Sequence, residues 1–238
     1  MKIDLKKYYE GRDLLAQNTA FDGPVLTFSR QYGCEGNRIA RMMVKEINDR
    51  PRLQKKHPWQ YISKEIIEDS AKELGLKPSV VDLKVQQYDA DPVRSLFASL
   101  GQHYDISESK IIEKINEIIL TYAKKGNIII VGRGGSFVTE GIERVLRVRL
   151  VAPIDWRVEN VSRSMKISLV NAAELIKKMD ANRNKWIENI SGRKFDQSTY
   201  DLIINVKTMD DHEISEMILN LMERREFIAV ASKYAVHA

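Results

Sequence analysis

Hydrophobic residues along the chain follow two different spacings in alternation. Short aliphatic and aromatic runs, typical of strands, are separated by longer segments in which apolar residues recur at helical spacing. The runs predict strands at 25–29, 59–62, 127–131, 145–152 and 200–206. The longer segments predict helices at 5–17, 64–74, 92–100, 107–125, 153–164, 168–189 and 210–226, and another that follows Gly36 and ends near residue 48.

The alternation of strands with long helical crossovers predicts a parallel sheet inside a three-layer α/β/α fold. Residues 23–227 are enough for one domain, with an appended polar segment at 1–22 and a tail at 228–238. Ligands of such sheets bind at the carboxyl ends of the strands. We therefore look for chemistry in the segments 29–37, 132–135 and 152–157.

Composition narrows the choice of ligand. The net charge of +5 fits a small polyanion such as a nucleotide, and nucleic acid is a weaker candidate because the chain has no concentrated basic block. The lone cysteine, Cys34, rules out an intramolecular disulfide, which agrees with a cytoplasmic location. We expect no membrane association, since the charged N-terminus lacks a signal-peptide core and no apolar run approaches a membrane span.

The first strand runs into a glycine turn that opens a helix. This geometry aims backbone N–H groups and a helix N-terminus at a phosphate. The expected phosphate-binding residues here are Ser29, Arg30, Gln31, Tyr32, Gly33, Cys34, Gly36, Asn37 and Arg38. The alternative is a plain turn whose arginines face solvent. The P-loop pattern G-x-x-x-x-G-K-[ST] is absent, because no lysine follows the second glycine.

Two further segments carry charge suited to phosphates. Arg133 lies between Gly132 and Gly134 directly after a buried strand, and arginine can hold a phosphate through two hydrogen bonds. Its alternative is a tight turn with a solvated arginine. Lys178, with the residues Asp180 and Arg183 on one helix face, fits a basic segment that closes over transferring phosphates, or an ordinary charged helix.

Metal and thiol chemistry have weaker support. The four histidines are scattered and show no metal-ligand spacing. Cys34 precedes a predicted helix N-terminus, which lowers a thiol pKa, so a nucleophilic or redox role is open beside that of a small residue filling a loop.

Several motifs together resemble the cytidylate kinase-like family, a branch of the P-loop nucleoside monophosphate kinases. The glycine turn and the helix start after it resemble the first motif of that family. Later segments resemble its third strand with a Gly-Arg turn, its next strand and helix, and its final strand, at 128–134, 148–157 and 200–205. The resemblance covers about residues 24–222.

This resemblance implies a P-loop NTPase kinase fold with a five-stranded parallel sheet and a helical lid at about 168–199. It implies ATP with Mg²⁺ as phosphoryl donor and a nucleoside monophosphate, CMP or dCMP, as acceptor. By position, Arg133 and Arg157 match arginines that hold the acceptor phosphate in that family, and Asp180 and Arg183 match its Asp-x-x-Arg lid motif.

The sequence departs from the family at the glycine turn. When the helix starts are aligned, Gly36 falls at the P-loop lysine and Asn37 at the magnesium-binding Ser/Thr, while Glu35 replaces a glycine. Arg30, Arg38 or a basic lid residue are candidates to replace the lysine. Four hypotheses follow: a nucleoside monophosphate kinase, a nucleotide-binding protein without turnover, a kinase with another acceptor, and a nucleic-acid binder.

Overall fold

The computed structural model describes residues 23–50, 58–63, 68–69, 72 and 108–229. The helices expected at 5–17 and 92–100, and most of the one expected at 64–74, lie outside these ranges. The same holds for the expected extension at 1–22 and for most of the tail.

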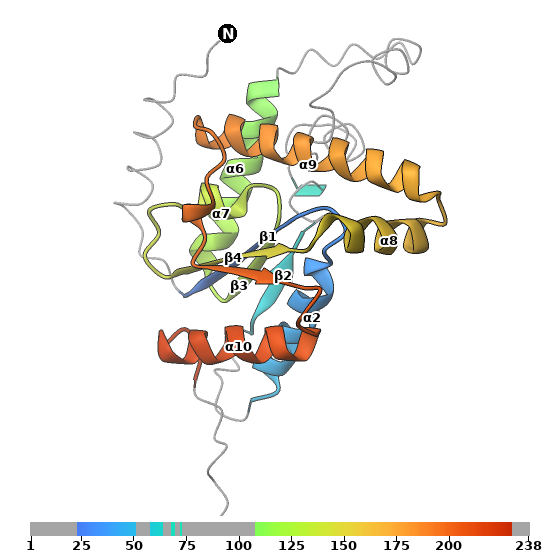
Figure 1. Cartoon of the computed structure of the whole chain (residues 1–238). Coiled ribbons are helices and arrows are strands. Elements are labelled where there is room, and N and C mark those ends of the chain that lie inside the picture. The colour runs from blue at the N-terminus through green and yellow to red at the C-terminus, as the bar shows by residue number, and fades with distance from the viewer. Residues whose placement is uncertain (1–22, 51–57, 64–67, 70–71, 73–107, 230–238) are drawn as a thin grey trace, which may run out of the picture.

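Five parallel strands form the sheet in the order β2-β3-β1-β4-β5 (Figure 1). This confirms the predicted α/β architecture. The central strand β1 pairs with β3 on one side and β4 on the other. The strands are β1 Val25–Arg30, β2 Gln60–Ile62, β3 Ile128–Val131, β4 Val145–Val151 and β5 Leu202–Asn205.

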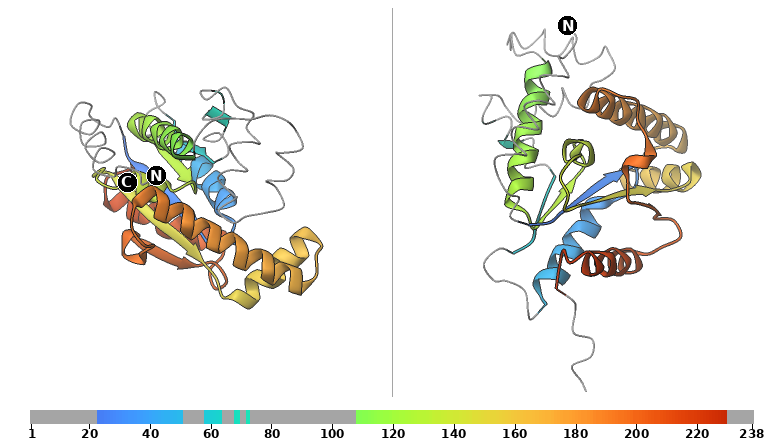
Figure 2. Two further views of the ribbon diagram at one scale, coloured as in Figure 1. Left: turned by 90° about the horizontal axis from the view of Figure 1, so that it is seen from above. Right: turned by 90° about the vertical axis from the view of Figure 1, so that its left-hand side faces the viewer.

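Helices cover both faces of the sheet (Figure 2). One face carries α2 Gly36–Asn48 and α10 Asp211–Arg224, and the other carries α6 Glu108–Lys125, α7 Gly135–Val138 and α9 Leu169–Ser191. Helix α8, Ile154–Met165, packs against α9, and the two form a hairpin beyond the carboxyl ends of β1 and β4 (Figure 1).

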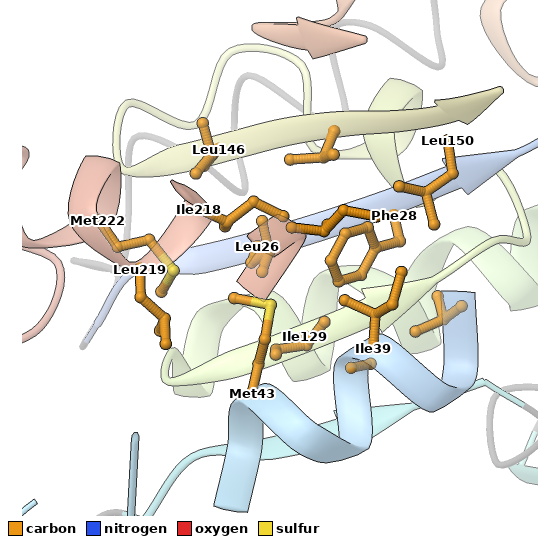
Figure 3. Close-up of a cluster of buried hydrophobic side chains, with 14 of the residues drawn as sticks. Leu26, Phe28, Ile39, Met43, Ile129, Leu146, Leu150, Ile218, Leu219 and Met222 are labelled. Carbon is orange, nitrogen blue, oxygen red and sulfur yellow. The ribbon is translucent and has the colours of Figure 1, made fainter. Parts of the chain in front are cut away.

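Alternate residues of β1 serve the two faces of the sheet. Leu26 and Phe28 are buried and point toward α2 and α10, where they meet Ile39 and Met43 (Figure 3). Burial of each such side chain stabilises the fold by about 1.5–3 kcal/mol. Thr27 faces the other side, where its hydroxyl lies 2.8 Å from that of Ser136 in α7. The central strand is therefore locked in register from both layers.

The helices differ in whether a side chain of the protein caps their N-terminus. Ser168 caps α9 by accepting a hydrogen bond from the Asn171 N–H, and Asp210 and Glu213 form a capping box on α10. Helix α2 has no side-chain cap hydrogen bond. Its N-terminus lies at the glycine turn, where the sequence predicts a phosphate.

The described elements follow the predicted ones to within two residues at each end, and β5 is one example of such a difference. The aliphatic run predicts a strand over 200–206, but the strand is Leu202–Asn205. A 3₁₀ turn at Gln197–Thr199 precedes it, and the Asp201 carboxylate accepts a hydrogen bond from the Arg147 N–H at the edge of β4. Among the described helices, none combines the length and the apolar composition that a membrane crossing requires.

Candidate functional site: an arginine-lined cavity beside a glycine turn

The carboxyl ends of β3, β1 and β4 lie side by side, so the three segments singled out in the sequence meet there. A cavity of about 330 Å³ opens at this edge, and we call it the arginine cavity. Its walls come from β1, the turn after β3, β4 and α9. The residues are Phe28, Ser29, Arg30, Tyr32, Gly132, Arg133, Gly134, Gly135, Ser136, Phe137, Arg149, Met179, Asp180, Asn182, Arg183, Asn184, Trp186 and Ile187.

The glycine turn is fixed to its surroundings by its own backbone. Gln31 donates its N–H to the Leu150 carbonyl, and its Oε1 accepts from the Ala152 N–H. Gly33 has φ +91°, and a Cβ at this position would press on the side chains of Val161 and Arg157. These contacts tie the turn to the end of β4 and to α8.

The N-terminus of α2 is left open to an anion. The Glu35 carboxylate, which would repel a phosphate, turns outward, with its side chain 61% exposed. The first turn of α2 contains no acidic residue. Gly36 is buried as the first helical residue, while Asn37 is exposed. The Gly36 N–H is bonded to the Cys34 carbonyl at 3.2 Å, and the helix dipole and the following N–H groups have no side-chain cap that would compete with a ligand.

Arg30 places its positive charge beside this N-terminus. Its Cδ lies against Gly36 and its guanidinium against Gly132, and a side chain at Gly132 would collide with the guanidinium. Burial, and then the neighbouring charges of Arg183 and Arg133, lower the pKa of Arg30. The guanidinium stays charged at neutral pH. A cation therefore lies next to the backbone position at which the P-loop pattern has its lysine.

Arg38, the other candidate from the glycine turn, points elsewhere. Its Nη2 donates to the Asp211 carboxylate at 3.0 Å, and the side chain is 67% exposed. It lines a second hollow of about 750 Å³, which we call the outer groove. This groove lies between the glycine turn, α8 and the segment that joins β5 to α10. Its residues are Gly33, Glu35, Arg38, Ile39, Trp156, Asn160, Val206, Lys207, Thr208, Met209, Asp210, Asp211, His212 and Glu213.

Arg157 does not reach the arginine cavity. Its side chain is buried, with Nε bonded to the Ala152 carbonyl and Nη1 bonded to the Tyr32 carbonyl and to Asp180 Oδ2 at 2.6 Å. Asp180 Oδ1 accepts the Tyr32 N–H at 2.7 Å. The expected contact of Arg157 with an acceptor phosphate has no support in this position. The Arg157–Asp180 pair instead ties α8 and α9 to the glycine turn.

Two further residues of the expected lid, Arg183 and Lys178, differ in whether they line the cavity. Arg183 lines the cavity, donates to the Arg30 carbonyl at 3.0 Å, and lies over the Tyr32 ring at 5.2 Å from its centre. Burial is the main cause that lowers the pKa of Arg183. Lys178 is exposed on α9 and lines neither hollow.

Arg133 takes the position that the sequence indicates. It lines the cavity from the turn after β3, with a left-handed backbone at φ +54°. Gly134 has φ +79°, and a Cβ there would collide with Ile190 of α9. The two glycines beside Arg133 therefore leave room for Arg30 on one side and for α9 on the other.

Arg149 is a cavity residue that sequence reasoning missed. It lies in β4 beside Ser29 of β1, and its guanidinium stacks 4.4 Å from the centre of the Phe195 ring. The available signal was the pair Arg147 and Arg149 in an otherwise aliphatic strand, since residues two apart share a face of the sheet.

Cys34 behaves as a core residue. It is buried with the side chains beneath β1, and burial is the main cause that raises the pKa of its thiol to about 11. The helix N-terminus does not overcome this desolvation. A reactive thiol at this position has no support.

The donor atoms fit phosphates better than a protein-held metal. The part of the chain that the structure describes contains no group of three or more His, Cys, Asp or Glu side chains able to hold a metal. In the cavity, both oxygens of Asp180 are engaged by Tyr32 and Arg157. A magnesium ion that enters with a nucleotide keeps phosphate oxygens and water as its main ligands, so this donor set remains compatible with MgATP as a substrate.

Comparisons with known proteins agree with this architecture. An uncharacterized protein from Eubacterium ventriosum ATCC 27560 has a similar structure, with a TM-score of 0.61 and 19% identity over 86% of this chain and 100% of that one. Shikimate kinase from Acinetobacter baumannii aligns at a TM-score of 0.47, with 11% identity over 87% of this chain and 96% of that chain. The corresponding values for shikimate kinase from Bacteroides thetaiotaomicron are 0.47, 12%, 85% and 98%. No curated protein matches the sequence.

The sequence itself assigns the family. The model of the cytidylate kinase-like family matches residues 25–208, which is most of the chain and includes all five strands. The parallel five-stranded sheet with helices on both faces is that of a P-loop kinase fold. The chain belongs to the cytidylate kinase-like family.

Proposed function

We propose that this protein transfers the γ-phosphoryl group of MgATP to a nucleoside monophosphate, with CMP or dCMP as the first acceptors to test. The observation that carries the proposal is the arginine cavity, which four arginines line, one of them, Arg30, lying also against the first residue of α2. Phosphoryl transfer asks a protein mainly to position two substrates and to stabilise negative charge. A cavity lined by arginines next to a helix N-terminus without a side-chain cap suits both needs.

Two hollows on the two sides of one glycine turn suit two substrates. The outer groove is the larger, and Trp156 gives it an aromatic wall for the base of the donor nucleotide. The donor phosphates then reach across the glycine turn toward the arginine cavity. The apolar wall formed by Phe137, Trp186 and Ile187 is suited to the uncharged part of the acceptor.

Arg30 takes the role of the missing lysine in this proposal. Its Cδ lies against Gly36 and its guanidinium against Gly132, at the strand end where a phosphate bound to α2 is expected. Arg183 approaches the same point from α9 and bonds the Arg30 carbonyl. The two cations neutralise charge on the phosphates during transfer. Magnesium, when bound with ATP, adds further charge stabilisation.

Arg133 holds the acceptor phosphate in this proposal. It lies at the carboxyl end of β3, and the flanking glycines let a ligand approach the backbone closely. Asp180 and Arg183 place α9 over the cavity, so α9 shields the transferring group from water.

A nucleotide-binding protein without turnover is the second candidate. Asp180 favours it, because its carboxylate already occupies the Tyr32 N–H in the glycine turn, and Gly36 leaves the P-loop lysine position empty. A kinase for another acceptor is compatible with the same cavity. A nucleic-acid binder has less support, since the chain has no concentrated basic block.

Steady-state formation of ADP from MgATP, with a panel of nucleoside monophosphates, tests the proposal. Arg133→Ala is compared with Lys178→Ala, which removes an exposed charge of α9 outside both hollows. We expect acceptor-dependent ADP formation, a rise in the acceptor KM of about 10-fold or more in Arg133→Ala, and no change in Lys178→Ala. An unchanged acceptor KM in Arg133→Ala would overturn the role of this residue. Nucleotide binding without turnover would favour the second candidate.

A further inference from the structure

Arg149 carries a buried charge that the protein does not balance. The residue is 8% exposed. Its Nη1 donates to two hydroxyl oxygens, Ser29 Oγ at 3.1 Å and Tyr200 Oη at 3.3 Å. Its Nε is buried and has no hydrogen-bond partner. Within the described residues no carboxylate pairs with it.

A guanidinium in this setting is unfavourable for the empty protein. Desolvating a charge is costly, and a buried ion normally has an opposite charge and full hydrogen bonding to offset that cost. The Phe195 and Tyr200 rings, with centres 4.4 and 5.4 Å from the guanidinium carbon, recover part of it. The open donor and the missing counter-charge both indicate a ligand that is an anion.

Arg147, which lies in the same strand, has a structural role and serves as a comparison. Arg147 projects from the same face of β4, but its Nε and Nη2 donate to the carbonyls of Ser136 and Thr139. These bonds join β4 to α7. Arg149, two residues further on, lines the cavity instead and leaves Nε without an acceptor.

Ser29 adds a second donor at the same place. Its Oγ accepts hydrogen bonds from Arg149 at 3.1 Å and from the Tyr200 hydroxyl at 3.0 Å. A hydroxyl that accepts two hydrogen bonds keeps its own proton for another acceptor. Ser29 lines the cavity, so this proton and the Arg149 guanidinium are available to one group.

Arg30 is the last residue of β1 and its guanidinium extends toward β3, where it lies against Gly132 in the turn after that strand, whereas Arg149 belongs to β4 on the other side of β1. The sheet order β3-β1-β4 and a strand spacing of about 4.8 Å separate these flanking strands by roughly 10 Å. The cavity therefore has a second positive centre, distinct from the one beside α2.

The geometry points to an oxyanion subsite formed by Arg149 and Ser29, which binds a phosphate or carboxylate group of the acceptor. This inference rests on the proposed function for the identity of the ligand as the acceptor. The family resemblance implied that Arg157 holds the acceptor phosphate, but its guanidinium is bonded to Asp180. The subsite takes over this role. It selects acceptors that carry an oxyanion over neutral nucleosides and sugars.

Calorimetric titration with inorganic phosphate and with acetate tests the subsite without any turnover. The full chain is first saturated with a non-hydrolysable MgATP analogue, so that the donor end is filled. Arg149→Met keeps the length of the side chain and removes its charge, Ser29→Ala removes the hydroxyl, and Arg147→Met is the matched control from the same face of β4. We expect at least 10-fold weaker anion binding in Arg149→Met, severalfold weaker binding in Ser29→Ala, and parental binding in Arg147→Met.

The thermal midpoint of unfolding distinguishes an anion-binding arginine from a structural one. Loss of an unbalanced buried charge leaves the thermal midpoint of Arg149→Met equal to or above that of the parent, whereas Arg147→Met has a lower midpoint because it loses its carbonyl bonds. Phosphate raises the midpoint of the parent by more than that of Arg149→Met, which keeps Arg133 and the start of α2 as phosphate-binding positions. Should Arg149→Met fail to fold, the structural role is supported, and Ser29→Ala decides the anion contact.

The outcomes separate this inference from the proposed function. Binding that depends on Arg149, with no ADP formed from any acceptor, supports the subsite and overturns the kinase proposal. ADP formation with an unchanged acceptor KM in Arg149→Met overturns the subsite and leaves the kinase intact. The phosphate and acetate titrations tell which oxyanion is preferred, and equal anion binding by parent and Arg149→Met overturns the subsite in every case.

Discussion

Arg30 and Gly36 exchange the residue types that a P-loop has at their positions. When Gly36 is placed at the lysine of G-x-x-x-x-G-K-[ST], counting back puts Arg30 at the first glycine and Glu35 at the second. The cation has moved from the helix to the strand end, and its side chain lies over the glycine that replaced the lysine. Glu35 is compatible with a phosphate because it faces solvent.

If Arg30 replaces the P-loop lysine, its removal lowers the activity, and a lysine at position 36 restores part of it. Arg30→Ala is expected to lower kcat/KM for MgATP by about 100-fold or more, as removal of a charge-stabilising group does. Adding Gly36→Lys to this variant is expected to restore part of the activity, since the Arg30 Cδ is then gone and a Cβ at position 36 meets Val131 and Leu150 at ordinary contact distances of 3.4 and 3.5 Å. Steady-state kinetics measure both. Parental activity in Arg30→Ala, or no gain from the lysine, would contradict the exchange.

We expect the Cys34 thiol to be alkylated slowly in the folded protein. Its pKa of about 11 leaves little thiolate at pH 8, so we expect alkylation to be about 100-fold slower than for a free cysteine thiol. Rates with iodoacetamide, compared before and after unfolding in guanidinium chloride, check this. Rapid labelling of the folded chain would show that the thiol is activated after all.

At the scale of elements, the junction of α9 with the glycine turn holds the site together. Tyr32 donates its N–H to Asp180, lies beneath Arg183, and packs with the small apolar cluster between α8 and α9. The hairpin expected to act as a lid therefore contacts the glycine turn directly. Its movement during a reaction stays a prediction.

Asp180→Asn tests this junction through stability. The change leaves the Arg157 guanidinium buried without its counter-charge, so we expect a loss of about 2–4 kcal/mol in the free energy of unfolding. Arg38→Ala breaks a more exposed pair and serves as a control, with an expected loss below about 1 kcal/mol. Denaturant unfolding measures both. Equal losses in the two variants would mean that the junction contributes little.

The elements were predictable from the sequence because their signals are local. Aliphatic runs such as Ile128–Val131 mark strands buried on both faces, and the glycine turn marks the ligand edge. The partners of the arginines were not predictable in this way. Arg157 meets Asp180 across the turn between two helices, and Arg149 meets Tyr200 from the segment before β5. Which charge is neutralised and which stays open depends on how α8 and α9 fold back over the sheet.

At the scale of the whole molecule, one glycine turn separates two hollows of different character. The arginine cavity is small and positively charged, and the outer groove is larger and bordered by the start of α10. A phosphoryl group that passes between two substrates needs two adjoining sites of this kind. A binding module needs only one hollow.

The transfer itself is the most direct test of the account. Phosphorus NMR of the protein with MgATP and CMP, dCMP or other monophosphates follows the γ-phosphoryl group and distinguishes transfer from hydrolysis. The account predicts loss of the γ resonance together with new diphosphate resonances from ADP and from the phosphorylated acceptor, in equal amounts. Folded protein that binds MgATP but yields no phosphorylated product with any acceptor would contradict it.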